Sequence, residues 1–477
     1  MAHWAGQRDV PDQAYATNAK WPEPWQPWQR AAAHRRKRGI PTVHQLEDEL
    51  RAASIEQDEL AHASTYIIFQ AILEGDLEPV REALKRRSAV EARAPGSGCT
   101  PIMVAAAAGE AAICGELIGA RANIHARDEA SGATAFIMAA AKGRAQVLEL
   151  LLKHAEEVEH TKYKLLQEVT HKGETALMAA AKYGHLEAVQ LLLDSGASWD
   201  SRAPKENHIT ALHLAASKGH LPVVMELLDR GALLEDPDNV GMRPLMHAAA
   251  HGHSVCVSEL LQRSPPADLE AHDERGRTAA LHAASQGFVE VLQVLEAAGA
   301  NLRARSLAGS TGLLLACRHG HVEVMEWWLS SADRESDIHE PRFSSGETPL
   351  HAAVRSGSLE LARRLLDRGA FLEQQDSRGW TPLSTCAAAG SLPMLQLLLQ
   401  HGASVITTDI KGRVPRRLAE QHRHSAAAHC LLVHAQKGLV KQAEENEDED
   451  RVGDTGQAPA DPQEPFLRSW RLQQGYS

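Results

Sequence analysis

The sequence predicts an all-α repeat fold, a solenoid of about eleven helix-turn-helix units joined by short β-hairpin loops. A Thr is followed nine residues later by a Gly at eight places along the chain, and a small residue stands five positions after each Thr. Only 4% of the 477 residues are aromatic. Alanine-rich segments with few large side chains favour closely packed helices over a thick globular core.

The first helix of each unit is expected to begin at this Thr and end at this Gly. A Thr side chain can accept a hydrogen bond from a free N–H of the first helical turn, and Gly suits the left-handed residue that ends a helix. Arg243 replaces Thr in one frame, and the outermost frames are degenerate. The frames begin near residues 66, 100, 134, 175, 210, 243, 278, 311, 348, 381 and 414.

A second helix and a hairpin complete each unit. Paired aliphatic residues, as in Leu192–Leu193 and Leu398–Leu399, predict the second helix. A Gly two residues before the next Thr predicts a tight hairpin with a positive φ, and only His208 replaces Gly there.

The frames predict four segments. Residues 66–437 form the repeat array, and residues 42–65 form a helix that caps it. Residues 1–41 form a Trp/Pro-rich, basic arm with seven Lys/Arg against three Asp/Glu, a net charge of +4. Residues 438–477 form an acidic tail with four Lys/Arg against nine Asp/Glu, a net charge of −5. Both ends have compositions that favour disorder. The arm could dock in cis or in trans, and the tail segment "PFLRSWRL" could form a short linear docking motif.

The unit resembles the ankyrin repeat. "GETPLHAAVRSGSLELARRLLDRGAFLE", Gly346–Glu373, is similar to the family pattern of a hairpin, a T-P-L-H-x-A helix and a second helix. The resemblance implies that the pattern's histidine, here His213 and His351, is a structural hydrogen-bonding group. It also implies that partners bind at the two residues before the helix-ending Gly and around the hairpin Gly.

From the sequence we predict no catalytic residue, no cofactor site and no metal site. It contains no P-loop, H-E-x-x-H, G-x-S-x-G or dinucleotide motif. The cluster from His422 to His434 fits no common zinc spacing and is interpreted as a hydrophilic last unit. The six cysteines are scattered, and we expect a soluble protein in the cytoplasm, with the nucleus as the alternative compartment.

A basic, partner-binding surface is predicted at the family's recognition positions. Among the eighteen residues that precede the helix-ending glycines, five are Lys or Arg and none is acidic, although residues 42–437 carry a net charge of −11. The alternative is that these residues only oppose the negative end of the helix dipole. The candidate residues are Lys142, Lys182, Tyr183, Lys218, His251, Arg275, Arg318, Arg355, Arg378, Trp380 and Lys411.

We therefore expect a non-catalytic protein–protein interaction scaffold or adaptor that binds an acidic or phosphorylated segment. One alternative is a substrate-recruiting or regulatory subunit of an enzyme complex. Another is a nuclear or nucleic-acid-associated protein, suggested by "HRRKR" at His34–Arg38, although the overall charge of −12 disfavours nucleic acid.

Two frames are longer than the others. Glu156–Glu174 is expected to extend a second helix or a hairpin, and Ser331–Glu347 is expected to be a loop that exposes Arg342 and Phe343. Insertions in repeat proteins map to loops, often on the binding side.

Overall fold

The structure is a computed structural model that describes residues 65, 68–85, 90–94, 96–157 and 160–436. The predictions for the basic arm, the capping helix before residue 65 and the acidic tail lie outside the described residues. The chain divides into two compact units, residues 1–307 and residues 308–477, and each is described by itself. No helix within the described residues is long and apolar enough to cross a membrane.

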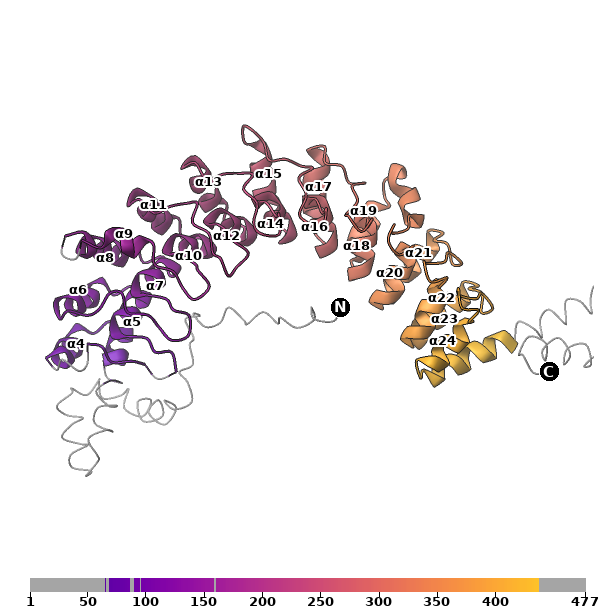
Figure 1. The fold of residues 1–477 in the computed structure, drawn as a ribbon, viewed down its shortest axis with the longest axis horizontal. Helices are drawn as coiled ribbons and strands as arrows, with labels where there is room; N and C mark the ends of the chain where they lie inside the picture. The colour runs from indigo at the N-terminus through magenta and orange to yellow at the C-terminus, as the bar shows by residue number, and fades with distance from the viewer. Residues whose placement is uncertain (1–64, 66–67, 86–89, 95, 158–159, 437–477) are drawn as a thin grey trace, which may run out of the picture. The chain divides into compact units, whose positions relative to one another are not determined.

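Unit 1 consists of two layers of short helices (Figure 1). Each first helix packs against the first helix of the next pair, and each second helix packs against the next second helix. In Figure 1 the first helices line the inner side of this unit. The first helices are α5 (Pro101–Ala108), α7 (Ala135–Ala141), α10 (Ala176–Tyr183), α12 (Ala211–Lys218), α14 (Pro244–Ala250) and α16 (Ala279–Gln286). The second helices are α4 (Leu77–Leu84), α6 (Ala111–Gly119), α8 (Ala145–Glu157), α11 (Leu186–Asp194), α13 (Leu221–Asp229), α15 (Ser254–Gln262) and α17 (Val289–Ala297).

Unit 2 repeats this arrangement. Its first helices are α18 (Gly312–His319), α20 (Pro349–Ser356), α22 (Pro382–Ala389) and α24 (Pro415–Gln421). Its second helices are α19 (Val322–Trp328), α21 (Leu359–Asp367), α23 (Leu392–Gln400) and a final helix over residues 425–436. The all-α repeat fold predicted from the sequence is therefore confirmed.

The first helices begin and end where the Thr–Gly frame predicts. The Thr175 and Thr348 hydroxyls accept hydrogen bonds from the N–H groups of Met178 and His351. The glycines that follow are left-handed, with φ of 77° at both Gly184 and Gly357. The small residue five positions after each Thr is fully buried between helices, which explains why alanine is almost invariant there.

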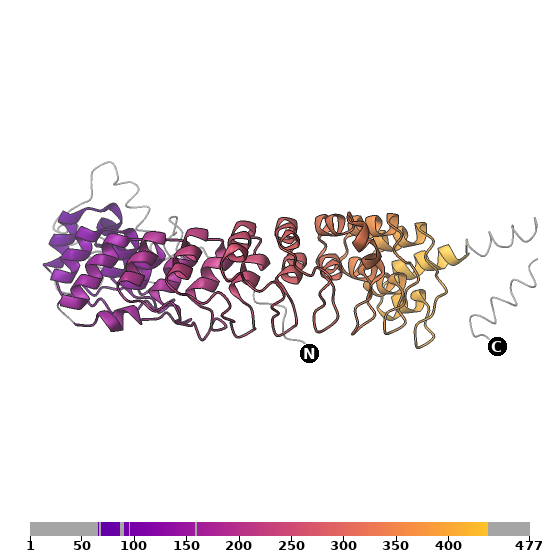
Figure 2. The same cartoon turned by 90° about the horizontal axis from the view of Figure 1, so that it is seen from above.

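The hairpins lie along one edge of each unit (Figure 2). Only two isolated β-bridges, Val169–Thr175 and Ala203–Ile209, occur among the described residues, so the expected β-hairpins are tight turns rather than strand pairs. The slot that Gly normally fills has a positive φ in each turn, and His208 adopts it with a φ of 55°. The predicted hairpin conformation is thus confirmed even where Gly is missing.

The two long frames have different outcomes. Helix α8 runs for 13 residues and is followed by the short α9 (Lys162–Leu166), so the predicted helical extension is confirmed. The predicted loop at Ser331–Glu347 is correct for residues 340–347 but wrong for Ala332–His339, which forms a 3-10 helix, η4. This helix is held by the buried carboxylate of Asp337, which accepts a 2.8 Å hydrogen bond from the Trp328 indole. Phe343 is 74% exposed as expected, but Arg342 is half-buried.

Candidate interaction surfaces

Histidines join the first helices to the hairpins. In α12 the His213 Nδ1 accepts from the Thr210 backbone N–H, and Nε2 donates to the Asp236 carbonyl at 3.0 Å. His351 makes the same pair of contacts, with Thr348 and with the Trp380 carbonyl at 2.8 Å. Burial lowers the pKa of His213 to about 4, so the ring stays neutral at physiological pH. The structural role implied for His213 and His351 is confirmed.

A second set of histidines caps the neighbouring first helix. The Nε2 atoms of His185, His220 and His253 donate to carbonyls in the last turn of the preceding first helix, at 3.1, 3.0 and 3.0 Å. Each such bond satisfies a carbonyl that the helix end leaves free. Among the described residues, no group of three or more His, Cys, Asp or Glu side chains is placed to hold a metal ion.

One row of candidate residues in unit 1 follows the ends of the first helices. Lys142, Tyr183, Lys218 and His251 each stand directly before a left-handed Gly, in successive first helices that pack side by side. Lys218 and His251 are exposed, whereas Lys142 and Tyr183 are half-buried. Burial lowers the pKa of His251, and electrostatic repulsion from the positive charge of Lys218 lowers it further.

Two candidate cations are neutralised by glutamates of their own hairpins. Lys182 lies 2.9 Å from the Glu174 carboxylate, with both side chains largely buried. Arg355 lies 3.5 Å from Glu347, which is 2% exposed. This pairing has a short sequence signature: a Glu directly before the capping Thr and a Lys or Arg eight residues after that Glu. Lys182 and Arg355 are therefore weaker candidates for partner contacts than the sequence suggested.

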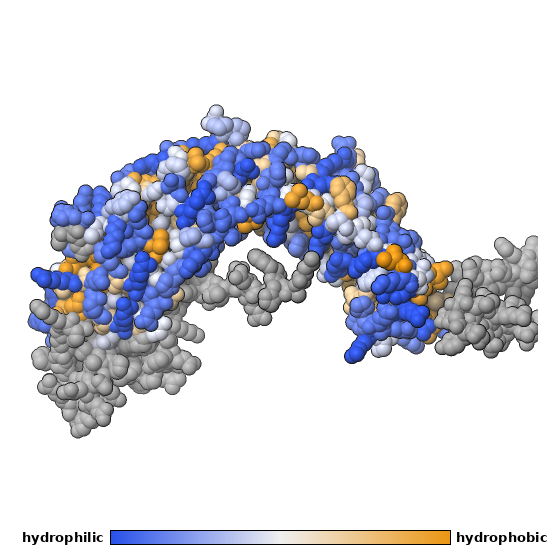
Figure 3. Space-filling view, viewed as in Figure 1, coloured by the Kyte–Doolittle hydropathy of each residue, from blue (hydrophilic) through white to orange (hydrophobic). Residues whose placement is uncertain are grey.

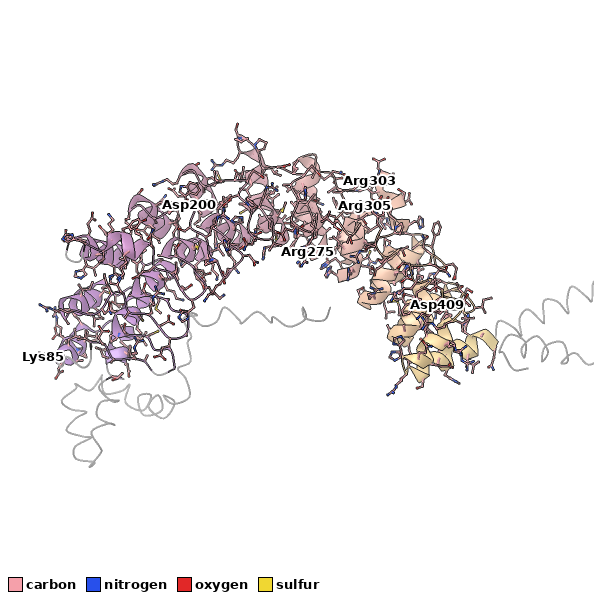
Figure 4. The ribbon with its side chains drawn as sticks, in the orientation of Figure 1. Lys85, Asp200, Arg275, Arg303, Arg305 and Asp409 are labelled. Carbon is pink, nitrogen blue, oxygen red and sulfur yellow. The ribbon has the colours of Figure 1, made fainter. Side chains whose placement is uncertain are left out.

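Three other candidate cations remain exposed. Arg275, at a hairpin tip of unit 1 (Figure 4), Arg318, in the last turn of α18, and Lys411, at the last hairpin tip, are all exposed. Their side chains make no ion pair with any residue that the structure describes. Such side chains can bind a carboxylate or a phosphate group without first breaking an existing ion pair.

Trp380 and Arg378 are structural rather than free. The Arg378 guanidinium lies 3.9 Å from the centre of the Trp380 ring and 2.7 Å from the Asp376 carboxylate. The Trp380 indole donates to Asp409 of the next hairpin at 3.3 Å. Trp380 thus joins two hairpins, and its use as a partner anchor stays a prediction.

Buried aspartates shape the hairpins, and sequence reasoning missed them. Asp273 Oδ1 accepts from the N–H groups of Arg275 and Arg277 at 2.9 and 2.7 Å, and Asp409 accepts from Lys411 and Arg413 at 2.9 and 2.8 Å. Burial alone would raise the pKa of Asp409, but these hydrogen bonds and the Arg413 side chain lower it to about 2. An Asp five residues before the capping residue of a first helix is the sequence pattern that could have predicted these hydrogen bonds.

Stacked helix pairs with exposed helix ends and hairpin tips define a repeat protein whose surface is suited to contacts with other proteins. The family model described as ankyrin repeats (3 copies) matches residues 68–162, 159–238, 232–306, 295–376 and 313–409. The chain belongs to the ankyrin repeat family, and its repeats form a protein-interaction domain.

Several proteins share part of this array. The probable E3 ubiquitin-protein ligase XBOS32 of Oryza sativa subsp. japonica is 32% identical over 154 residues, 27% of this chain and 31% of that protein. The ankyrin repeat and KH domain-containing protein mask-1 of Caenorhabditis elegans is 33% identical over 130 residues, 27% of this chain and 5% of that protein. The crystal structure of the ankyrin repeat domain of Bcl-3 shares 29% identity with a TM-score of 0.38, and the match covers 45% of this chain and 95% of that one. The matches to XBOS32 and mask-1 span less than a third of those proteins' own lengths.

Proposed function

We propose that this protein is a non-catalytic scaffold or adaptor that binds an acidic or phosphorylated segment of a partner protein. The observation that supports this proposal is the cationic character of the first-helix ends. Lys218 is exposed there in unit 1, next to the neutral His251, and Arg318 is exposed there in unit 2. We place the protein in the cytoplasm, with the nucleus as the alternative compartment.

The binding would depend on several weak contacts together. An exposed pair between a cation and a carboxylate contributes about 0.2–1 kcal/mol, so one cation alone gives little affinity. Within unit 1, the cations Lys142 and Lys218 at the ends of first helices can engage an extended acidic segment at more than one point. The half-buried ring of Tyr183, directly before Gly184, offers apolar contact beside the cations.

The test is affinity capture from cell extract with the intact chain and two charge-reversal variants. Lys218→Glu with Arg318→Glu reverses two cations of the first-helix ends. Lys153→Glu with Arg363→Glu is the matched control, because both residues are exposed on second helices, α8 and α21. Circular dichroism establishes that all three chains are equally helical.

The proposal predicts that one set of proteins is lost only with the Lys218/Arg318 variant, and that these proteins carry acidic or phosphorylated segments. Retention of the same proteins by all three chains would show that the basic residues only oppose the helix dipole.

A second candidate function is substrate recruitment for a ubiquitin ligase. It is favoured by the similarity of this chain to XBOS32 and to the E3 ubiquitin-protein ligase XBAT32 of Arabidopsis thaliana, which is 30% identical over 155 residues. It predicts that captured material contains ligase subunits and that captured partners become ubiquitinated when ubiquitin, E1 and E2 enzymes and ATP are added. Absence of both would remove this candidate.

A further inference from the structure

In the last helix pair of unit 2, the first helix carries charged residues at positions that are buried in the preceding first helices. Helices α20 and α22 each bury all of the first six positions after the capping residue, because a first helix packs on either side. Helix α24 buries only Pro415, Leu418 and Ala419 of these six. The positions that should contact a following helix are Arg416, Arg417 and Glu420.

The hairpin before α24 also has no further hairpin packed against it among the described residues. A side chain added at Gly309, Gly346 or Gly379 would strike the next hairpin, whereas nothing described lies within 4 Å of such a position at Gly412. Ile410 is 72% exposed at this hairpin tip. The face of the stack formed by Lys411, Arg416, Arg417 and Arg423, called the end face below, is therefore uncovered by the described residues.

The end face is cationic rather than simply polar. Residues 377–436 carry six Lys/Arg against two Asp/Glu, a net charge of +4. Of the two acids, Asp409 is buried in its hairpin, and Glu420 pairs with Arg416 at 2.9 Å. Lys411, Arg417 and Arg423 are exposed and make no ion pair with the described part of the chain. A terminal unit needs only a polar outer surface for solubility, which residues of mixed sign would supply. In the space-filling view, hydrophobic side chains stand among strongly hydrophilic ones over this unit (Figure 3).

The chain carries a segment of opposite charge directly after this helix pair. Six of the seven residues of Glu444–Asp450 are acidic. Only residues 437–443 separate this run from the final helix, and they can span up to about 27 Å. Because α24, with seven residues, is about 10 Å long, this tether reaches across the end face.

We propose that the acidic run Glu444–Asp450 binds the end face of its own chain through Lys411, Arg417 and Arg423. A short tether places the run at an effective concentration on the order of 1 mM, so several weak ion pairs suffice to keep it bound. The bound tail covers the uncovered face of the last helix pair and withholds these cations from acidic segments of other proteins. This contact differs from the first-helix ends of the proposed function.

The first experiment locates the contact in the full-length chain. A zero-length carbodiimide reagent joins an amine to a carboxylate in direct contact, and Lys411 supplies the amine. We expect a cross-link from Lys411 to a residue of Glu444–Asp450 within the monomer, identified by mass spectrometry. Lys411→Arg should abolish it. A monomer with no such link at low salt would overturn the proposal.

The second experiment measures competition. A fluorescent peptide of residues 440–454 is titrated against the full-length chain and against a tail-neutral variant in which the six acids of Glu444–Asp450 become Gln or Asn. Fluorescence anisotropy should show at least about tenfold tighter binding to the tail-neutral variant, because its end face is free.

Charge reversals in the tail-neutral chain then identify the surface. Arg417→Glu with Arg423→Glu should weaken peptide binding at least about fivefold, since each lost contact with an exposed cation contributes modestly. Lys153→Glu with Arg363→Glu makes the same change of charge at exposed cations of second helices and should leave the affinity unchanged. Equal losses in both variants, or equal affinity of the peptide for the full-length and tail-neutral chains, would overturn the proposal without bearing on the proposed function.

Discussion

At the scale of single residues, the structure uses histidine as a neutral connector. His351 is fully buried and bonds both the start of its own helix and the following hairpin. The histidine role could be inferred from the sequence because it recurs at equivalent positions. The pairing of Lys182 with Glu174 could not, because it depends on a hairpin folding back onto the last turn of a helix.

Replacement of His351 by Ala should lower the free energy of unfolding by about 2–4 kcal/mol. The change leaves the Trp380 carbonyl without its donor and creates a cavity at a buried site. His422→Ala, at an exposed position, is the control and should change stability by less than about 0.5 kcal/mol. Urea unfolding followed by circular dichroism measures both, and equal effects would contradict the connector role.

Stability should fall as the pH is lowered from 7.5 to 5. Burial lowers the pKa values of His185, His213, His220 and His351 below the ordinary value of 6.5. Below pH 6.5 the unfolded chain therefore binds protons that the folded chain does not, and each histidine's stabilising contribution is lost as the pH falls toward its folded pKa. Thermal unfolding at several pH values tests this, and a midpoint that stays constant or rises would refute it.

At the scale of elements, the Thr–Gly frame predicted where the first helices begin and end, because capping is local chemistry. The hairpin conformation followed from the Gly slot, but the buried aspartates that hold it were missed. Helix η4 could not be predicted, since its stability comes from the tertiary contact between Trp328 and Asp337 rather than from a periodic pattern.

Asp273→Ala should loosen one hairpin without unfolding unit 1. The substitution removes the acceptor for the Arg275 and Arg277 N–H groups and for His282 Nε2 at 3.1 Å. Hydrogen exchange of the amides of residues 274–277 should become at least about tenfold faster, which corresponds to a loss of about 1.4 kcal/mol. Glu274→Ala, an exposed neighbour, should leave these rates unchanged. Unchanged protection in Asp273→Ala would show that the turn holds without its carboxylate.

Alanine substitutions at two glycines distinguish the cost of a left-handed backbone from the cost of a steric clash. Gly219 has a φ of 74°, and an added Cβ would lie 2.4 Å from His253 Nδ1. Gly231 has a φ of 94° with nothing within 4 Å of that position. Gly231→Ala should cost about 1 kcal/mol from the left-handed conformation alone, and Gly219→Ala should cost more because His253 must move. Denaturant unfolding that ranks them in the reverse order would contradict this account.

At the scale of the whole molecule, both units are built from the same kind of helix pair, and both expose cations at the ends of first helices. Histidines and basic residues recur at equivalent positions of the repeats, which by itself favours scaffold roles over a single active site. Which cations remain unpaired among the described residues was decided by the fold, because glutamates of their own hairpins pair with Lys182 and Arg355 but none pairs with Arg318.

The central claim is that cations at the first-helix ends bind acidic or phosphorylated segments. The most direct measurement is binding of the labelled full-length chain to an array of acidic peptides, phosphorylated and unphosphorylated, beside sequence-scrambled neutral peptides. The intact chain should bind a subset of the acidic peptides, less so as salt is raised, because salt screens exposed charges. Lys218→Glu with Arg318→Glu should lose these peptides, while Lys153→Glu with Arg363→Glu keeps them. An intact chain that binds no acidic peptide, or a Lys218/Arg318 variant that binds the same set, would contradict the claim.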